Sequence, residues 1–300
     1  MIQRILTALV LIPLVLLLIL RAPIWLLAIV AGIVALLAIR EFLELTRHYG
    51  VEPFTTATYL VVGFVFVVVT IIVGPGNFLN LNALVLGILV WLSAGLAPFV
   101  FLAVGLHRGS LNSIYPAAAA SVFAYTYVAI PMALLVAIVD STRGGFYLIY
   151  LLLVVWAGDI FAYFVGKSVG RHKMSPRVSP QKTWEGALAS VIASIGIGTI
   201  FYHFALPISR WLLRIHLMKS SATFWDLRDT AMWKVALLSV VLNVAAQLGD
   251  LVESAIKRGA DVKDSGSILP GHGGMLDRID AMLFASPVLC LIVLVGSHLD

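Results

Sequence analysis

Charged residues are scarce in this 300-residue chain. They make up 12% of the residues, while hydrophobic residues make up 61% and the mean hydropathy is +1.03. An ordinary soluble domain has about 25% charged residues, so this composition excludes a soluble globular protein as well as a disordered or collagen-like chain. The single cysteine, Cys290, excludes an intrachain disulfide scaffold. We also find no internal repeat, heptad or low-complexity tract. The chain is predicted to lie in a lipid bilayer.

Long hydrophobic runs, separated by charged or Gly/Pro-rich breaks, predict an all-α, polytopic integral membrane protein. A bilayer core of about 30 Å needs roughly 20 apolar residues per helix. The first run follows Arg4 and is interpreted as a retained helix, because no small-residue cleavage site follows it. About nine transmembrane helices are predicted, at 4–20, 23–40, 55–74, 83–104, 114–139, 145–166, 185–206, 233–250 and 281–298.

The net charge of +5 is interpreted as a signal of topology, with no nucleic-acid partner expected. With the N-terminus inside, 13 of the 20 lysines and arginines fall on the cytoplasmic side, largely in loops 167–184 and 251–280. The other side carries most of its cations around 207–232, where an amphipathic surface stretch is expected. The short loops and the lack of a targeting segment favour a bacterial inner (plasma) membrane, although an organellar membrane stays open.

Polar residues are distributed unevenly between the two halves. We expect residues 1–140 to be a helical scaffold and 141–300 to be the catalytic region. The first unusual residue is Asp159, because a carboxylate in an apolar run costs at least about 2.5 kcal/mol at the bilayer centre. Either it makes an interhelical contact that holds the bundle together, or it forms one wall of a polar cavity. Helical spacing places three more residues on its face: Tyr163, Gly166 and Lys167.

A basic run follows between 166 and 186, with no acidic residue before Glu185. Such a run is typical of a positive-inside signal or an anionic-lipid contact. The dense Gly, Ser, Thr and Pro around it are also typical of a loop that binds phosphate oxygens. Ser179 or Thr183 is expected to cap the helix that begins near Trp184. The cations of this run are Lys167, Arg171, Lys173, Arg177 and Lys182.

The third polar cluster lies between 247 and 280. Asp277 and Asp280 have i, i+3 spacing at the start of the last helix and project together. Carboxylates without cysteine, beside cations, suit a hard ion such as Mg²⁺. The alternative is a loop in which acids and cations only neutralise one another. If the preceding helix continues past residue 250, four residues share one of its faces: Asp250, Ser254, Lys257 and Arg258.

Glycines surround His272 in this cluster, and they favour close backbone approach to a ligand. The role of His272 itself stays open between a general acid or base, a phosphate donor and a structural hydrogen bond. The glycines are Gly271, Gly273 and Gly274.

The third cluster resembles the phosphatidate cytidylyltransferases, also called CDP-diacylglycerol synthases. The resemblance covers about residues 155 to 285, and Gln181 stands where many members have lysine. The later motif is Ser254-x-x-Lys257-Arg258, Lys263-Asp264, Pro270-x-His272-Gly273-Gly274 and Asp277-Arg278-x-Asp280. The earlier motifs are Asp159 with Ala162-Tyr163, Gly166-Lys167, Gly170-Arg171-His172-Lys173, Ser179-Pro180, Lys182-Thr183 and Glu185-Gly186.

The resemblance implies transfer of a cytidylyl group from CTP to phosphatidic acid, which gives CDP-diacylglycerol and pyrophosphate for phospholipid synthesis. It implies a Mg²⁺-dependent enzyme with room for a second cation, and it leaves a homodimer open. Asp250 and Asp277 are the implied metal ligands, with Asp280 as a ligand or a partner of one. The implied catalytic residues are Asp250, Asp277, Lys257, Arg258, Lys263, His272 and Arg278. The implied substrate-binding residues are Asp159, Lys167, Arg171, Lys173, Ser179, Lys182, Ser254, Asp264, Gly273 and Gly274.

Three other readings remain. A CTP-dependent kinase of polyisoprenol lipids would release CDP and leave no cytidine in lipid. A transporter of phosphorylated metabolites would more often show repeat symmetry, which we do not see. A structural scaffold would not explain the concentration of acids, cations and glycines on one side. Because phosphatidate keeps its tails in lipid, we expect its head group to enter sideways between helices, with Asp159 at the back of a funnel open to cytosolic CTP.

Overall fold

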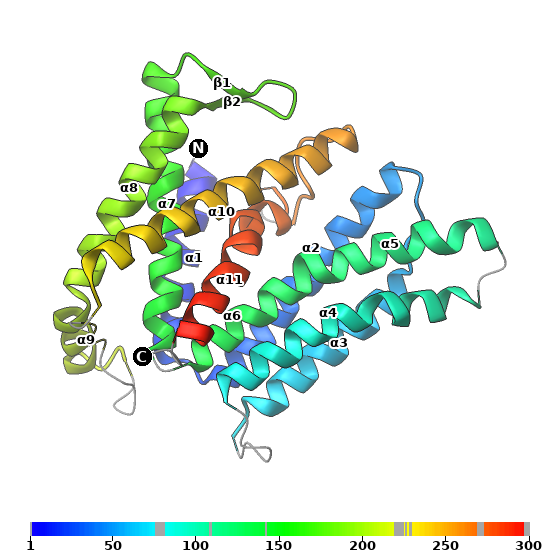
Figure 1. Cartoon of the computed structure of the whole chain (residues 1–300), viewed down its shortest axis with the longest axis horizontal. Coiled ribbons are helices and arrows are strands. Elements are labelled where there is room, and N and C mark those ends of the chain that lie inside the picture. Colours follow the sequence, from blue (N-terminus) through cyan, green and yellow to red (C-terminus); the bar gives the residue numbers. More distant parts are fainter. Residues whose placement is uncertain are drawn as a thin grey trace.

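The computed structural model describes residues 2–75, 82–107, 110–141, 143–218, 225, 227, 230–268 and 273–296, with side chains omitted for 2–8 and 294–296. The all-α fold class is confirmed, because helices make up most of the described chain (Figure 1). The helices are α1 (Ile2–Arg21), α2 (Ile24–His48), α3 (Thr55–Ile72), α4 (Ala83–Gly105), η1 (Leu111–Ser113), α5 (Ile114–Ala124), η2 (Tyr125–Ala129), α6 (Ile130–Asp140), α7 (Gly144–Val169), α8 (Trp184–His203), α9 (Ala205–Arg214), α10 (Met232–Gly259) and α11 (Leu276–Gly296).

Helix is found in every one of the nine predicted ranges, but nine membrane spans are not confirmed. Among the described residues, seven helical segments are long and apolar enough to cross a membrane. They are α2, α3, α4, the continuous stretch Leu111–Asp140, α7, α8 and α10. In α1, side chains are described only for Leu9–Arg21, and this apolar stretch is shorter than the seven spans. The molecule is therefore a polytopic helical membrane protein with seven segments of membrane-spanning length among its described residues.

The outer surface of the bundle is hydrophobic. Leu60 and Phe64 on α3 are 69% and 68% exposed, and Phe99 on α4 is 72% exposed. A cluster of such side chains is unfavourable in contact with water but not in contact with lipid tails, because the tails are equally apolar. The interior holds large side chains such as Phe101 and Tyr150, both fully buried. This pattern fits a bundle with lipid on its sides.

Two of the predicted loops are partly regular structure. The segment 167–184, expected to be a loop, contains an antiparallel hairpin of β1 (Lys173–Ser175) and β2 (Ser179–Thr183). Thr183 then caps α8, as predicted, by accepting a hydrogen bond from the Gly186 amide at 3.2 Å. The predicted loop 251–280 is also too long, because α10 runs on to Gly259 and α11 already begins at Leu276.

The helices of the two sequence halves pack against each other. Helix α7 lies along α8, while α10 packs against both α8 and α11. Helix α11 also contacts α6 and α2, so the last helix joins the first half of the chain to the second. The hairpin and the C-terminal end of α10 lie at the same end of the molecule (Figure 1), where the Arg258 Nε donates to the Val178 carbonyl at 3.4 Å. This end gathers the segments that carry the polar motifs.

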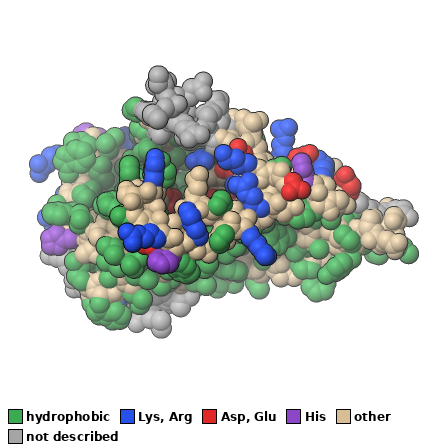
Figure 2. All heavy atoms as spheres, turned by 90° about the horizontal axis from the view of Figure 1, so that it is seen from above, with side chains coloured by type: hydrophobic (Ala, Val, Ile, Leu, Met, Phe, Trp, Pro, Cys, Tyr) green, Lys and Arg blue, Asp and Glu red, His purple; other side chains and the backbone are tan. Residues whose placement is uncertain are grey.

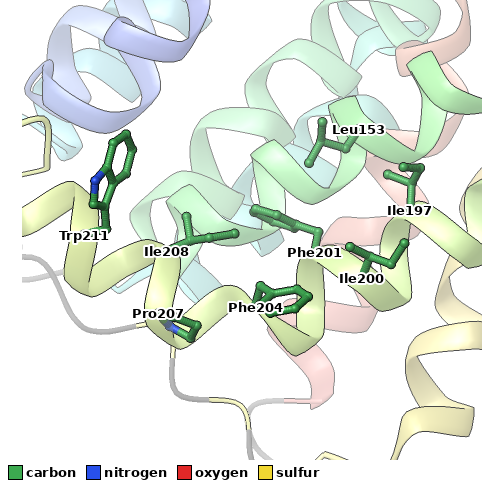
Figure 3. Close-up of a pocket in the computed structure, with 8 residues that line it drawn as sticks. All are labelled: Leu153, Ile197, Ile200, Phe201, Phe204, Pro207, Ile208 and Trp211. Carbon is green, nitrogen blue, oxygen red and sulfur yellow. The ribbon is translucent and has the colours of Figure 1, made fainter.

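The amphipathic stretch expected around 207–232 is helical in its first part. Helix α9 buries Leu212 and exposes Trp211 at 56%. It helps to form an apolar groove of about 490 Å³ at the end of the molecule away from the hairpin (Figures 1 and 3). The groove is lined by hydrophobic side chains alone: Leu153, Ile197, Ile200, Phe201, Phe204, Pro207, Ile208 and Trp211. It offers no acid, base or charge for chemistry.

Candidate functional site

A polar cavity of about 660 Å³ lies between α7, α8, α10 and the hairpin. It combines carboxylates, lysines and amides with small residues that let the helices approach closely. Figure 2 views this end of the molecule and shows lysine and arginine side chains gathered over its middle. The lining residues are Asp159, Ala162, Tyr163, Gly166, Lys167, Lys173, Met174, Ser179, Gln181, Lys182, Thr183, Gly186, Ala187, Ser190, Gln247, Asp250 and Leu251.

The predicted polar stripe of α7 lines this cavity. Asp159 and Lys167 both belong to the lining, and the Lys167 ammonium lies 5.6 Å from the centre of the Tyr163 ring. Asp159 lies near enough to Asp250 for the two negative charges to repel each other, and the charge of Lys182 offsets this repulsion. Of the two readings of Asp159, the structure supports the wall of a cavity.

Asp250 on α10 faces the hairpin. Its Oδ2 lies 2.7 Å from the Lys182 Nζ, and its Oδ1 accepts a hydrogen bond from the Ser254 hydroxyl at 3.3 Å. Helix α10 does continue past residue 250, the condition on which the shared face depended, and the Ser254 contact is an i, i+4 pair on that face. The carboxylate is held between a cation from the hairpin and a hydroxyl from its own helix.

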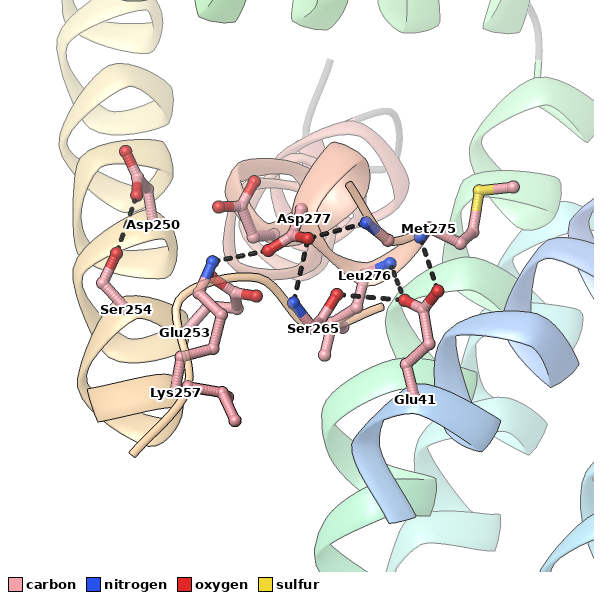
Figure 4. A network of polar contacts seen from close by, with 12 residues as sticks. Glu41, Asp250, Glu253, Ser254, Lys257, Ser265, Met275, Leu276 and Asp277 are labelled. Atoms are coloured by element: carbon pink, nitrogen blue, oxygen red, sulfur yellow. Dashed lines mark hydrogen bonds and ion pairs between the residues drawn. The ribbon is translucent and has the colours of Figure 1, made fainter. Parts of the chain in front are cut away.

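A second network joins α10 to the first turn of α11 (Figure 4). The Lys257 Nζ lies 2.5 Å from Asp277 Oδ1 and 2.5 Å from Glu253 Oε2. Asp277 Oδ2 accepts the amides of Ser265 at 3.0 Å and Gly274 at 2.8 Å. Lys257 thus serves two carboxylates at once, and both oxygens of Asp277 are already bonded.

Glu253 is a residue of this network to which the sequence analysis gave no role. Its side chain is fully buried and its nearest cation is Lys257. An unpaired carboxylate in such a place would cost several kcal/mol. The i, i+4 spacing of Glu253 and Lys257 was a local signal that could have identified the pair.

Glu41 is a second residue that the sequence analysis missed. It lies on α2, only 4% exposed, and accepts hydrogen bonds from the Ser265 hydroxyl and from the Met275 and Leu276 amides. The motifs that the sequence shows in 141–300 therefore rest on a side chain from the first 140 residues.

A buried polar cluster fastens α10 to α8 directly behind the cavity. The Asn243 Nδ2 donates to the hydroxyls of Ser190 and Ser194, each at 2.8 Å, and the Gln247 Nε2 donates to the Asn243 Oδ1 at 2.6 Å. A Cβ at Gly158 would collide with the Asn243 amide and lie 2.6 Å from the Ser190 hydroxyl. Gly158 is adjacent to Asp159, so this packing also fixes one wall of the cavity.

Gly158→Ala is expected to lower the free energy of unfolding by about 1–3 kcal/mol, because the added methyl overpacks this cluster. The matched control is Gly196→Ala on α8, where a Cβ would meet nothing within 4 Å. There, alanine is expected to be neutral or to stabilise by up to about 1 kcal/mol. Denaturation of both variants in mixed micelles measures the difference, and equal stabilities would contradict the packing argument.

The remaining predicted site residues occupy several positions. Arg171 is exposed and does not belong to the cavity lining. Arg258 bonds the backbone of Val178 and Val262, so it ties the hairpin to the end of α10. Three further residues are exposed: Lys263, Asp264 and Arg278.

The described part of the predicted glycine-rich segment has one unusual backbone conformation. Gly273 adopts a φ of +79°, in the left-handed region that favours glycine. His272 lies outside the described residues, as does Gly271.

The predicted metal ligands are not assembled into one group. Within the part of the chain that the structure describes, no three His, Cys, Asp or Glu side chains are placed together to hold a metal ion. Asp280 does lie close enough to Asp250 and Asp159 for their charges to interact, and its Oδ1 accepts the Ala281 amide at 2.7 Å. The carboxylates therefore form a loose set on three helices, α7, α10 and α11.

Comparison with known proteins identifies the family. The model of the Cytidylyltransferase family matches residues 2–295. The chain is 45% identical over 147 residues to a phosphatidate cytidylyltransferase of Bacillus subtilis. The matched residues are 49% of this chain and 46% of that protein. It is 38% identical over 148 residues to the protein of the same name from Haemophilus influenzae, 49% of this chain and 46% of that protein.

A third relative, the phosphatidate cytidylyltransferase of Staphylococcus haemolyticus, is 38% identical over 152 residues, half of each chain. The chain thus spans about half the length of these curated relatives in the matched parts. The family model, in contrast, covers nearly the whole chain. The chain belongs to the cytidylyltransferase family.

Proposed function

We propose that this protein is a phosphatidate cytidylyltransferase. It would transfer the cytidylyl group of CTP to phosphatidic acid and release pyrophosphate, at the cytoplasmic face of a bacterial inner membrane. The relatives that match half of the chain bear this name. The observation that carries the proposal is the cavity in which Asp159, Lys182 and Asp250 meet, at the end of a bundle whose sides face lipid.

The cavity suits a reaction between two phosphorylated molecules, one of which stays in the bilayer. A phosphate oxygen of phosphatidic acid attacks the α-phosphorus of CTP, a new P–O bond forms, and the bond to the β-phosphate oxygen breaks as pyrophosphate leaves. Catalysis then needs alignment of the two substrates and compensation of negative charge, with no covalent nucleophile. Lys167, Lys173 and Lys182 are the cations that line the cavity and would bind phosphate oxygens.

Lys182 and Asp250 form an ion pair in the cavity. A triphosphate offers more negative charge than one carboxylate, so it would draw Lys182 away from Asp250 and leave that carboxylate free. The same exchange applies to Lys257 and Asp277, where the ammonium now occupies Oδ1. Substrate binding would in this way free Asp250 and Asp277 from their lysine partners, so that they could bind a metal ion.

Mg²⁺ is the ion that these acids fit by their chemistry, since they are carboxylates beside cations and substrate phosphates. Asp250 would bind the ion from the cavity wall. Asp277 would bind it only after Lys257 has moved away from Oδ1. Asp280 would either bind the ion or hold one of its ligands. When bound, the ion would neutralise charge on the phosphates during transfer.

The test uses purified protein in detergent with phosphatidic acid, Mg²⁺ and CTP labelled in the cytidine. We expect the label to enter the chloroform-soluble fraction, with one pyrophosphate released per cytidine transferred, and EDTA to abolish both. Transfer of a γ-phosphate label to a polyisoprenol, with all cytidine left in water, would instead establish the kinase. If the folded protein transfers neither the cytidine nor the γ-phosphate label to lipid, the proposed activity is wrong. The transporter alternative would then be tested by uptake of phosphorylated metabolites.

A further inference from the structure

Glu41 is a carboxylate within an apolar membrane-spanning helix. It is 4% exposed, among neighbours such as Phe42 and Leu43 that are more buried still. A buried charge of this kind is retained only where strong hydrogen bonds or charges compensate for the lost water. The groups that donate hydrogen bonds to Glu41 therefore show which part of the protein it fixes.

The compensation comes from the segment before α11 and from the first turn of that helix (Figure 4). Glu41 Oε1 accepts the Met275 amide at 3.0 Å, and Oε2 accepts the Leu276 amide at 2.8 Å and the Ser265 hydroxyl at 3.0 Å. All three donors are neutral. Free amides and the positive end of the helix dipole stabilise a carboxylate at a helix N-terminus, so Glu41 serves α11 as a cap supplied from a distant helix.

The cap is fitted closely to its surroundings. Any side chain at Gly266 or Gly274 would collide with the Glu41 carboxylate, so these two glycines leave the space that it fills. Two glycines and three donors therefore converge on one carboxylate. Described residues on both sides of 269–272, namely Ser265 and Gly266 before it and Gly274, Met275 and Leu276 after it, pack against or bond Glu41.

The cap is also connected to the predicted acids. Ser265 donates its hydroxyl to Glu41 and its amide to Asp277 Oδ2, so one residue fixes both carboxylates. Gly274, which packs on Glu41, donates its amide to the same oxygen of Asp277. The position of Asp277, and of Asp280 one turn later, therefore depends on the cap.

We propose that Glu41 is a positioning residue for cytidylyl transfer. It holds the first turn of α11 so that Asp277 and Asp280 face α10, and it does so without touching substrate. The kinetic part of this inference rests on the proposed function. The structural part, that Glu41 fixes the amides of Met275 and Leu276, stands independently of it.

The test compares Glu41→Gln with Glu44→Gln. Glutamine at position 41 keeps the size of the side chain but turns one acceptor into a donor that faces N–H and O–H groups. Glu44 lies one turn later on the same helix, 59% exposed and paired with Arg47, so its replacement makes the same chemical change in water. We expect Glu41→Gln to lower kcat about tenfold or more and Glu44→Gln to leave it unchanged.

Two readouts separate positioning from a general loss of folding. The half-saturating Mg²⁺ concentration is expected to rise about tenfold in Glu41→Gln, since residues that orient metal ligands affect affinity on this scale. Loss of folded protein alone would lower the rate and leave that concentration unchanged. Hydrogen exchange of the peptide that contains Met275 and Leu276 is expected to be faster in Glu41→Gln and unchanged in Glu44→Gln.

Ser265→Ala provides a milder variant if Glu41→Gln does not fold. It removes one of the three donors and is expected to produce the same changes at a smaller size. Wild-type kinetics and wild-type exchange in either folded variant would overturn the inference. If the wild-type protein transfers no cytidine, the proposed function is wrong, and the exchange measurement still decides whether Glu41 fixes the turn.

Discussion

Asp250→Asn is expected to lower kcat for cytidylyl transfer by about 10²–10³-fold. The substitution removes a proposed ligand of the Mg²⁺ ion that would compensate the charge of the phosphates, and losing one such charge-compensating interaction has an effect of this size. Asp250 is the carboxylate that reaches the cavity from α10 and the partner of Lys182. The amide would release Lys182 to bind phosphate more freely, so the KM for CTP should stay constant or fall. Initial rates of cytidine incorporation into lipid, at varied CTP and Mg²⁺, separate the two constants.

The control for this variant is Asp261→Asn. Asp261 is exposed just beyond α10 and has a φ of +56°, a conformation that asparagine adopts easily. It makes the same change of charge at the same end of the molecule, so its rate should match the wild type. A rate for Asp250→Asn within about threefold of the Asp261→Asn rate would remove Asp250 from the reaction.

Lys257→Met is expected to cost about 3–5 kcal/mol of unfolding free energy, the usual loss when one partner of a buried ion pair is removed. The side chain of Lys257 is 12% exposed, that of Glu253 1% and that of Asp277 5%. Methionine fills a similar volume but leaves both carboxylates without their shared cation. Reversible denaturation in mixed micelles measures the loss, and cytidylyl transfer should disappear with it.

A second substitution distinguishes the lost charge from lost packing. In Lys257→Met with Glu253→Gln, the fully buried carboxylate is neutral, so part of the stability should return. Lys234→Met, on the same helix but exposed near its other end, should leave stability within about 0.5 kcal/mol of the wild type. Equal losses in the single and double variants would show that the charge of Lys257 contributes little.

The helices, and the arrangement of polar residues along one helix, were predictable from spacing. Hydrophobic runs marked the helices, and i, i+4 geometry placed Asp159 and Lys167 on one wall and Asp250 beside Ser254. These relations are local, because residues within two turns of one helix keep their arrangement whatever the helix packs against. The structure confirms them through the lining of the cavity and the bond between Ser254 and Asp250.

The contacts between distant segments were not accessible. Glu41 meets Leu276 235 positions later in the chain, and no periodicity in α2 indicates that its carboxylate caps another helix. The hairpin was missed for a different reason. Its strands are short and rich in polar residues, so the register of Lys173 opposite Thr183 leaves no alternation of apolar side chains to detect. The specific partner of Asp277, Lys257 on α10, was also not predictable, because the two residues lie on different helices.

The position of two cavity lysines depends on how the hairpin is anchored. A two-stranded ribbon has no core of its own and depends on outside anchors, here Arg258 on the Val178 carbonyl and Glu185 on the His172 amide. Lys173 and Lys182 lie on this ribbon, whereas Asp159 and Asp250 lie on helices α7 and α10. We therefore expect a ligand that contacts both the lysines and the carboxylates to lose affinity when either anchor is removed, because the ribbon would then have to be ordered at the expense of binding energy. By thermodynamic linkage, the same ligand would stabilise the ribbon in return.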